Sequence, residues 1–319
     1  MRVRKNSLKE IAIALLLLLA MIVSGACSRS PLMPQSGGKP YEVVLIGDYD
    51  SIVYHELDAD VEGLPQSEPY FDILMTDSAS GSQLLARNVV IVNKDSLRYS
   101  RTHIRYDQDV NASPQLMVYI HTPSVAALQR EMPQLGGRLR QLLTQAEMNR
   151  GKDFLKEKHN EKAERLIENM FGIKMQIPAD LTSSKRGKQF LWLSNQSAEA
   201  QRCICLYEVA PYPAQDMSIR DSVMKSNIQG ETDTMYMCTT PGTAIAYKQK
   251  QADGHEEYLV RGLWEMHGDA MGGPFVQRII PTDDHRTIVC EAFVFAPGMN
   301  KRNLIRQLEA SLMTLKYEQ

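Results

Sequence analysis

The residue types most able to do chemistry gather in the short stretch 261–275. Glu265, His267 and Asp269 occupy alternate positions there, so an extended backbone would present all three on one face. An imidazole between two carboxylates suits a divalent cation, which makes a metal-assisted hydrolase the alternative prediction for function. The helix-borne His-Glu-x-x-His pattern fails, because position 259 is leucine. We favour a polar, solvated turn held by glycines, and we predict no metal site and no cofactor.

Apolar residues and glycines surround these polar groups. Gly272-Gly273-Pro274 is predicted to form a tight turn that closes a C-terminal sheet layer, so that valine at Gly272 would be strained if its φ is positive. The loop is therefore expected to line the main ligand-facing concavity of that layer. Its apolar members, Met266 included, are interpreted as a core plug rather than a ligand box. The candidate binding residues are Trp264, Glu265, His267, Asp269, Met271 and Phe275.

Two further polar groupings lie in the first half of the chain. Arg101, His103 and Arg105 alternate and could bind an anion, although surface salt bridges are the favoured interpretation. No Gly-x-Ser-x-Gly elbow or phosphate-binding loop accompanies either grouping, so no catalytic residues are predicted and a non-enzymatic role is favoured. The second grouping is acidic and follows the first expected strand, where α/β sheets bind ligands; it consists of His55 with Asp48, Asp50, Glu56 and Asp58.

The first 26 residues have the pattern of a lipoprotein signal peptide. Four basic residues precede a 13-residue apolar run at 11–23, too short for the ~20 residues that span a bilayer. Small residues then precede Cys27, although Ser24 stands where leucine or valine is usual. We predict an acylated Cys27 and a flexible tether over 27–39, with ordinary signal-peptide cleavage as the alternative. Because Ser28 follows the cysteine, the expected location is the periplasmic face of the outer membrane.

The net charge indicates which classes of binding partner are expected, and the cysteines raise the separate question of disulfides. The formal charge is −2; removing residues 1–26, with four basic residues and one acid, leaves 32 basic and 37 acidic residues and a charge of −5. This mildly acidic balance argues against nucleic acid as a partner. The expected partners are the membrane, through the lipid anchor, and an envelope protein or small ligand. Four cysteines remain, either in disulfides or as buried free thiols: Cys203, Cys205, Cys238 and Cys290.

Hydrophobic periodicity predicts an α+β protein. Apolar, β-branched runs predict a small α/β-type sheet domain over residues 40–122. Runs that alternate apolar and polar residues predict a C-terminal domain over 172–319, mainly an antiparallel sheet with helices packed on it. A last helix over 300–315 presents a leucine-rich face to that sheet.

A helical connector over 123–171 is predicted to join these two domains, because its apolar residues recur three or four positions apart. Pro133 and Gly136-Gly137 should break or kink it, giving a short helix and then a longer one. A second amphipathic helix is expected to end at Gly172 as its C-cap.

The lipobox at Cys27 and five further stretches carry a family resemblance; the stretches are 37–43, 105–110, 160–163, 271–275 and 296–303. With these features the chain resembles an uncharacterised lipoprotein family of the Bacteroidota, a domain of unknown function. This resemblance implies no particular activity and no catalytic residues. The element order over 172–316 separately resembles the PsbP and Mog1 fold, whose members are mainly binding or assembly factors. We therefore predict a lipid-anchored, non-enzymatic binding or assembly module.

Overall fold

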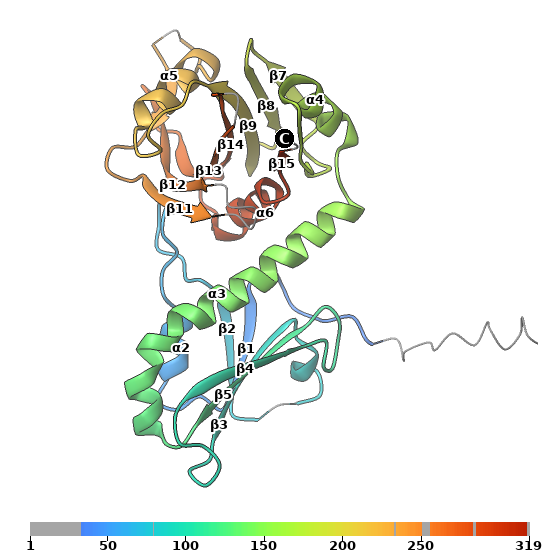
Figure 1. Cartoon of the computed structure of the whole chain (residues 1–319), viewed down its shortest axis with the longest axis vertical. Coiled ribbons are helices and arrows are strands. Elements are labelled where there is room, and N and C mark those ends of the chain that lie inside the picture. Colours follow the sequence, from blue (N-terminus) through green and yellow to red (C-terminus); the bar gives the residue numbers. More distant parts are fainter. Residues whose placement is uncertain (1–32, 79, 233, 251–255, 283–284, 318–319) are drawn as a thin grey trace, which may run out of the picture.

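The structure is a computed structural model that describes residues 33–78, 80–232, 234–250, 256–282 and 285–317. The predicted signal peptide and Cys27 lie outside the described residues. Two large sheets, each with its own helices, form an N-terminal and a C-terminal part, and the long helix α3 runs between them (Figure 1). The α+β prediction is confirmed. No helix in the described ranges is both long and apolar enough to cross a membrane.

The N-terminal sheet has five strands in the order β2-β1-β3-β5-β4. The first four of these run parallel, and β4 pairs antiparallel with β5 at the edge. Near-continuous apolar runs in β1, β3 and β5 suit central strands, which are buried on both faces except towards the carboxyl ends of β3 and β5. The strands are β1 (Glu42–Ile46), β2 (Asp72–Thr76), β3 (Asn88–Lys94), β4 (His103–Gln108) and β5 (Leu116–Thr122).

The two α-helices of this part cover one face of the sheet. α2 (Ile52–Leu57) and α3 (Val125–Glu157) pack on it, where Leu128 and Leu139 of α3 meet the inward side chains of the strands. Over the opposite face the described chain contributes the short helix η1 (Gln83–Leu85), which packs near the amino ends of the strands. The carboxyl ends of β3 and β5 therefore keep an open face.

The expected break in the connector is wrong, because α3 is one continuous helix of 33 residues with Pro133 inside it. Pro133 faces solvent, while the apolar stripe of the helix stays packed on the sheet, and that burial outweighs the lost backbone hydrogen bond. Gly136 has a packing role, since a Cβ there would lie 1.9 Å from Oε2 of Glu56, which pairs with Arg140 at 2.8 Å. Gly172, at φ 68, ends the following helix α4 (Glu161–Phe171) as predicted.

The C-terminal part is an antiparallel, curved sheet of eight strands with helices on both faces. α4 and α6 (Arg302–Leu312) pack on one face, and α5 (Met217–Asn227) packs on the other. A two-stranded sheet of β6 (Ile173–Lys174) and β15 (Lys316–Tyr317) lies beside them. The eight strands are β7 (Ser183–Arg186), β8 (Phe190–Ser194), β9 (Gln201–Val209), β10 (Tyr236–Thr239), β11 (Ile245–Lys250), β12 (Glu256–His267), β13 (Gly272–Pro281) and β14 (Thr287–Phe295).

The four described cysteines are free thiols rather than disulfides. Burial raises the pKa of the Cys203 thiol to about 12, and it raises the pKa of Cys205 and Cys290 as well. Thiols held in this protonated form are poor nucleophiles and metal ligands, so these residues serve as core apolar groups.

The two parts meet at the N-terminus of α6. Glu68, which is 3% exposed, accepts the backbone N–H of Lys301 through Oε1 at 2.7 Å and that of Arg302 through Oε2 at 2.9 Å. Lys301 occupies the N-cap position and forms no side-chain cap bond of its own. The carboxylate thus provides from the other part the acceptors and the negative charge that a helix N-terminus favours.

Replacing Glu68 with alanine should lower the free energy of unfolding by about 1–3 kcal/mol, because two buried N–H groups lose their acceptor. Glu68→Gln keeps one acceptor oxygen, so its free energy of unfolding should fall by less than that of Glu68→Ala. Glu161→Ala, on the exposed first turn of α4, is the matched control and should change stability by less than about 0.5 kcal/mol. Urea unfolding measures all three; equal losses at Glu68 and Glu161 would contradict this role.

Candidate functional site

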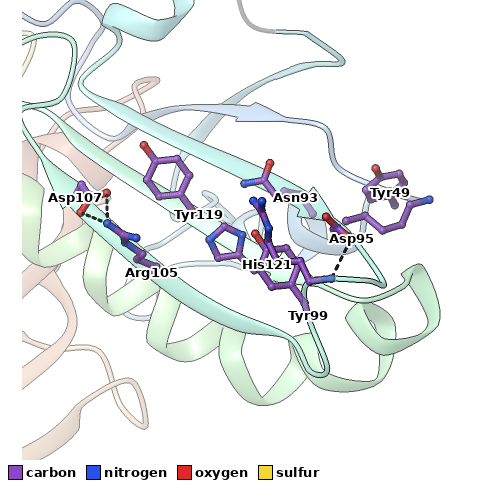
Figure 2. Close-up of a pocket in the computed structure, with 11 residues that line it drawn as sticks. Tyr49, Asn93, Asp95, Tyr99, Arg105, Asp107, Tyr119 and His121 are labelled. Atoms are coloured by element: carbon purple, nitrogen blue, oxygen red, sulfur yellow. Dashed lines mark hydrogen bonds and ion pairs between the residues drawn. The ribbon is translucent and has the colours of Figure 1, made fainter.

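A basin of about 690 Å³ lies on the open face of the N-terminal sheet, near the carboxyl ends of β3 and β5 (Figure 2). Ligands in α/β sheets bind beyond this end of the strands, so the position is favourable. The volume falls in the range of roughly 300–1,000 Å³ that small-molecule sites occupy. The lining residues are Tyr49, Val92, Asn93, Lys94, Asp95, Arg98, Tyr99, Arg105, Asp107, Tyr119 and His121.

Strand register brings these side chains together. His103 of β4 pairs with His121 of β5, and Arg105 pairs with Tyr119. Because side chains alternate between faces with a period of two, all four project from the same side of the sheet. Asn93 on β3 pairs with His121 and joins the same face, and the β3–β4 connection adds Tyr99.

An aromatic and imidazole stack forms the middle of the basin. The ring centroid of His121 lies 4.6 Å from that of Tyr99, 5.1 Å from that of His103 and 6.2 Å from that of Tyr119, whose plane is only 3° from parallel. Nδ1 of His121 is buried and has no hydrogen-bond partner. A buried ring nitrogen without a partner is costly, and a ligand group that bonds to it would remove that cost.

Charges around the stack are predominantly positive. Asp95 accepts hydrogen bonds from the backbone N–H groups of Leu97 and Arg98, and Asp107 lies 3.4 Å from Nη2 of Arg105. The Arg98 guanidinium forms no hydrogen bond or ion pair with any described residue. Burial, with smaller contributions from His103, Arg105 and Arg98, lowers the pKa of His121. The basin therefore presents a neutral imidazole beside an unpaired guanidinium.

The alternating residues Arg101, His103 and Arg105 are partly brought to this basin. Arg105 lines it, and the ring of His103 lies 5.1 Å from that of His121 at an angle of 44°, whereas Arg101 is not among the lining residues. The tyrosines and His121 were missed by sequence reasoning. The signal that could have found them is the run of polar and aromatic residues directly after β3, together with His121 near the end of β5.

The acidic grouping near His55 has a structural role. Asp48 accepts the backbone N–H groups of Tyr49, Val53 and Tyr54, and so it fixes the start of α2. Glu56 pairs with Arg140 of α3. Asp48 and Glu56 therefore stabilise α2 and its packing against α3.

The 265–269 stretch lies at the β12–β13 hairpin and lines a shallower concavity of about 460 Å³. Glu265 accepts the Thr240 hydroxyl at 2.9 Å, and the ring of His267 stacks on Tyr236 with centroids 4.9 Å apart. Asp269 lies in the turn itself. Within the described ranges, no group of three His, Cys, Asp or Glu side chains is placed to hold a metal ion.

The apolar members of the predicted set lie deeper. Trp264 and Phe275 are 2% and 1% exposed and belong to the core beneath α5, while Met271 packs against that core from the edge. Trp264 and Met271 contribute to the lining of the shallow concavity, and Phe275 does not. The six residues are thus divided between core and surface, and their role in binding stays a prediction.

The predicted turn at Gly272-Gly273-Pro274 is wrong. Gly272 begins strand β13 and pairs with Glu265, without a positive φ; the reversal occurs earlier, at Gly268 with φ 84. Gly273 is required for close packing, because a Cβ there would lie 2.0 Å from the carbonyl oxygen of Val294. That oxygen also accepts Nε1 of Trp264 at 3.2 Å. The glycines serve contact between strands, not chain reversal.

Fold and basin together define an α+β protein with a ligand-sized basin on an open sheet face. Residues 160–314 match the family model described as Domain of unknown function (DUF4837), and residues 36–156 match the one described as Domain of unknown function (DUF8532). The expected similarity to domains of unknown function is confirmed to that extent. Lipoprotein character and origin in the Bacteroidota stay predictions.

No curated protein matches the chain. Among solved structures, the Ran-binding protein Mog1p of Saccharomyces cerevisiae is similar at a TM-score of 0.31 and 10% identity, over 46% of this chain and 92% of that one. A protein from Bacteroides thetaiotaomicron is similar at a TM-score of 0.23 and 11% identity, over 46% of this chain and 45% of that one. These similarities are distant.

Gly273→Ala should cost about 2 kcal/mol or more of folding free energy, because strands β13 and β14 must separate to admit the methyl group. Gly137→Ala is the opposite case: its Cβ meets nothing nearer than 4.0 Å, and alanine should stabilise helix α3 by about 0.5–1 kcal/mol. Thermal and urea unfolding of the pair provide the test. A Gly273→Ala protein as stable as the wild type would contradict the strand contact.

Proposed function

We propose that this protein is a non-enzymatic binding module, lipid-anchored through Cys27 at the periplasmic face of the outer membrane. Its ligand site is the basin on the N-terminal sheet. The single observation that supports this site is the unpaired Arg98 guanidinium beside the neutral His121, whose buried Nδ1 has no partner. The ligand class is a small anion that carries a flat ring.

The chemistry of the lining supports this ligand class. A guanidinium presents a planar fork of donors that matches carboxylate, sulfonate or phosphate oxygens. Tyr99, Tyr119 and His121 offer ring faces for stacking at the same place. The phenol groups of the two tyrosines can donate or accept hydrogen bonds. A ring-bearing anion could therefore contact a guanidinium and stack on an aromatic ring in the same basin.

A binding role fits the lining better than catalysis does. The lining residues of the basin include no serine, threonine or cysteine that His121 could activate. The alternative, a metal-assisted hydrolase at 265–269, has no supporting observation, because Glu265 and His267 already contact Thr240 and Tyr236.

Benzenesulfonate is a suitable probe, since it has a flat ring and a charge that does not change near neutral pH. Arg98→Met should weaken its binding about tenfold, as expected for loss of a charge-assisted hydrogen bond. Arg165→Met removes an exposed arginine of α4 and is the matched control, with no expected change. Calorimetry with the full chain measures both. Equal binding by the Arg98→Met protein would exclude the basin as the anion site.

The same titration carries a pH signature. A bound anion favours the charged imidazole, so it raises the pKa of His121, which is lowered in the free protein. Affinity should therefore rise as pH falls below about 6.5 and level off below the free-state pKa. His121→Gln should remove this dependence. A wild-type affinity that is flat from neutral to acidic pH would contradict a role for His121.

The anchor has its own test. Cys27→Ser removes the thiol that would be acylated, so the protein should move from the membrane fraction to the soluble periplasm, or accumulate as uncleaved precursor. Cys238→Ser, at a partly exposed thiol of β10, should leave the distribution unchanged. Fractionation followed by immunoblotting measures both variants. A wild-type protein that is already soluble would rule out the anchor.

A further inference from the structure

A second and separate cavity lies between the two parts of the molecule. It has a volume of about 800 Å³ and shares no lining residue with the basin. Its walls come from α3, from α6, from the segment that leads into β1, and from residues 178–180. Pockets at such junctions are common ligand sites. Much of the lining is apolar: Pro40, Phe154, Leu155, Pro178, Ala179, Leu308 and Ala310.

Arg306 is a charged residue in the wall of this cleft and is only 4% exposed. Its guanidinium donates one hydrogen bond, from Nη1 to the carbonyl oxygen of Tyr70 at 3.3 Å, and lies 4.5 Å from the ring centroid of Tyr41. No carboxylate of a described residue pairs with it. Burial lowers the pKa of Arg306, and nearby Tyr41 and Glu309 act in the opposite direction; the guanidinium stays charged.

The neighbouring charged residues form ion pairs with one another, and Arg306 does not take part in them. Glu309, one turn along α6, pairs through Oε1 with Arg261 at 2.5 Å, while its buried Oε2 has no hydrogen-bond partner. Elsewhere in the cleft, Glu147 forms ion pairs with both Arg87, at 2.9 Å, and Arg150, at 2.6 Å. The cleft therefore contains a guanidinium that no described carboxylate pairs with directly, although the charge of Glu309 offsets part of the cost of its burial.

Tyr41 supplies a second polar group at the same place. Its hydroxyl has no hydrogen-bond partner among the described residues, and burial raises its pKa, so the phenol is a neutral donor at physiological pH. Its backbone adopts φ 63, the left-handed region that a bulky residue rarely occupies. Strain of this kind is typical of functional sites, and here it holds the tyrosine ring against Arg306.

We propose that this cleft binds an amphipathic anion: one carboxylate or phosphate group on an apolar body. The anionic group bonds to the free guanidinium nitrogens of Arg306 and to the Tyr41 hydroxyl. The apolar body lies along Phe154 of α3, which is 56% exposed, and the apolar residues of α6. A free fatty acid and an anionic membrane lipid share this chemistry. This site is independent of the basin and of the function proposed for it.

Octanoate is the probe, titrated by calorimetry into the full chain with Cys27→Ser, which carries no acyl group on that residue. Octanoate should bind, whereas acetate, with the charge alone, and octanol, with the apolar body alone, should bind about tenfold more weakly or not at all. Phosphatidylglycerol vesicles are then added. Displacement of octanoate assigns the site to membrane lipid, and unchanged octanoate binding assigns it to free amphiphiles.

Three variants test the geometry. Arg306→Met should weaken octanoate about tenfold and leave octanol unchanged. Phe154→Ser should weaken octanoate, while Leu97→Ser, at a side chain 98% exposed and outside the cleft, should not. If Arg306→Met does not fold, Ala179→Trp fills the cleft from its exposed rim and should abolish binding. No octanoate binding by the parent protein, or binding that Arg306→Met or Ala179→Trp leaves unchanged, overturns the proposal.

Discussion

The docking of α6 against the N-terminal part is the constraint on which the rest of the arrangement depends. The helix begins without a cap of its own, and Glu68 provides both acceptors from across the junction. Its opposite side puts Ile305, Leu308 and Leu312 into the core of the C-terminal sheet. α6 therefore completes the core of the C-terminal part, while the N-terminal part provides the hydrogen-bond acceptors for its first N–H groups. Directional hydrogen bonds fix the junction more narrowly than apolar contact alone would.

Both proposed sites follow from the geometry of the N-terminal sheet. The basin lies near the carboxyl ends of β3 and β5, on the face that α2 and α3 do not cover. The cleft lies at the other end of the same strands, where Tyr41, Arg87 and Pro114 precede β1, β3 and β5. There α3 approaches α6 so closely that a Cβ on Gly151 would lie 2.9 Å from Cβ of Ala310. A parallel sheet with one covered face thus offers two separate environments, one solvent-facing and one between packed helices.

Local patterns in the sequence predicted the elements well where a single physical effect dominates. Apolar runs identified β1, β3 and β5, and Gly172 was identified as a helix end, because burial and glycine's access to positive φ act within a few residues. Pro133 was misjudged because tertiary packing of α3 overrides a local preference. Gly272 was misjudged because a glycine that allows close strand contact and a glycine that turns the chain look alike in sequence.

The sites themselves could be predicted only in part, because their members are distant in the chain. The basin joins Tyr49, Tyr99 and His121 from three separate segments, and their approach depends on the pairing of β4 with β5. Arg105 and His103 were recognisable as a candidate anion patch, since they alternate on one strand. The cap of α6 joins residues 233 positions apart. No local pattern in a single sequence reports such a pairing.

The buried arginines show why Arg306 is better explained by a ligand than by folding alone. Arg220 holds Glu291 in a two-bond pair at 2.9 and 2.7 Å, and Arg278 holds Glu257 in the same way. Arg302 likewise reaches Asp72 at 2.7 Å. Burying a cation is costly unless a counter-ion compensates, and three of the four buried arginines of the described chain meet that condition internally.

The direct contacts of Arg306 are two tyrosine rings and one carbonyl oxygen, and the charge of Glu309 acts on it without forming an ion pair. Cation–π contacts offset part of the desolvation cost, but they leave most of the guanidinium N–H groups without acceptors. Arg306 and Arg278 both line cavities wide enough for an organic molecule, but of these two only Arg278 has a carboxylate partner among the described residues. An anion from outside the chain would provide for Arg306 the counter-ion that Glu291, Glu257 and Asp72 provide for the other three buried arginines.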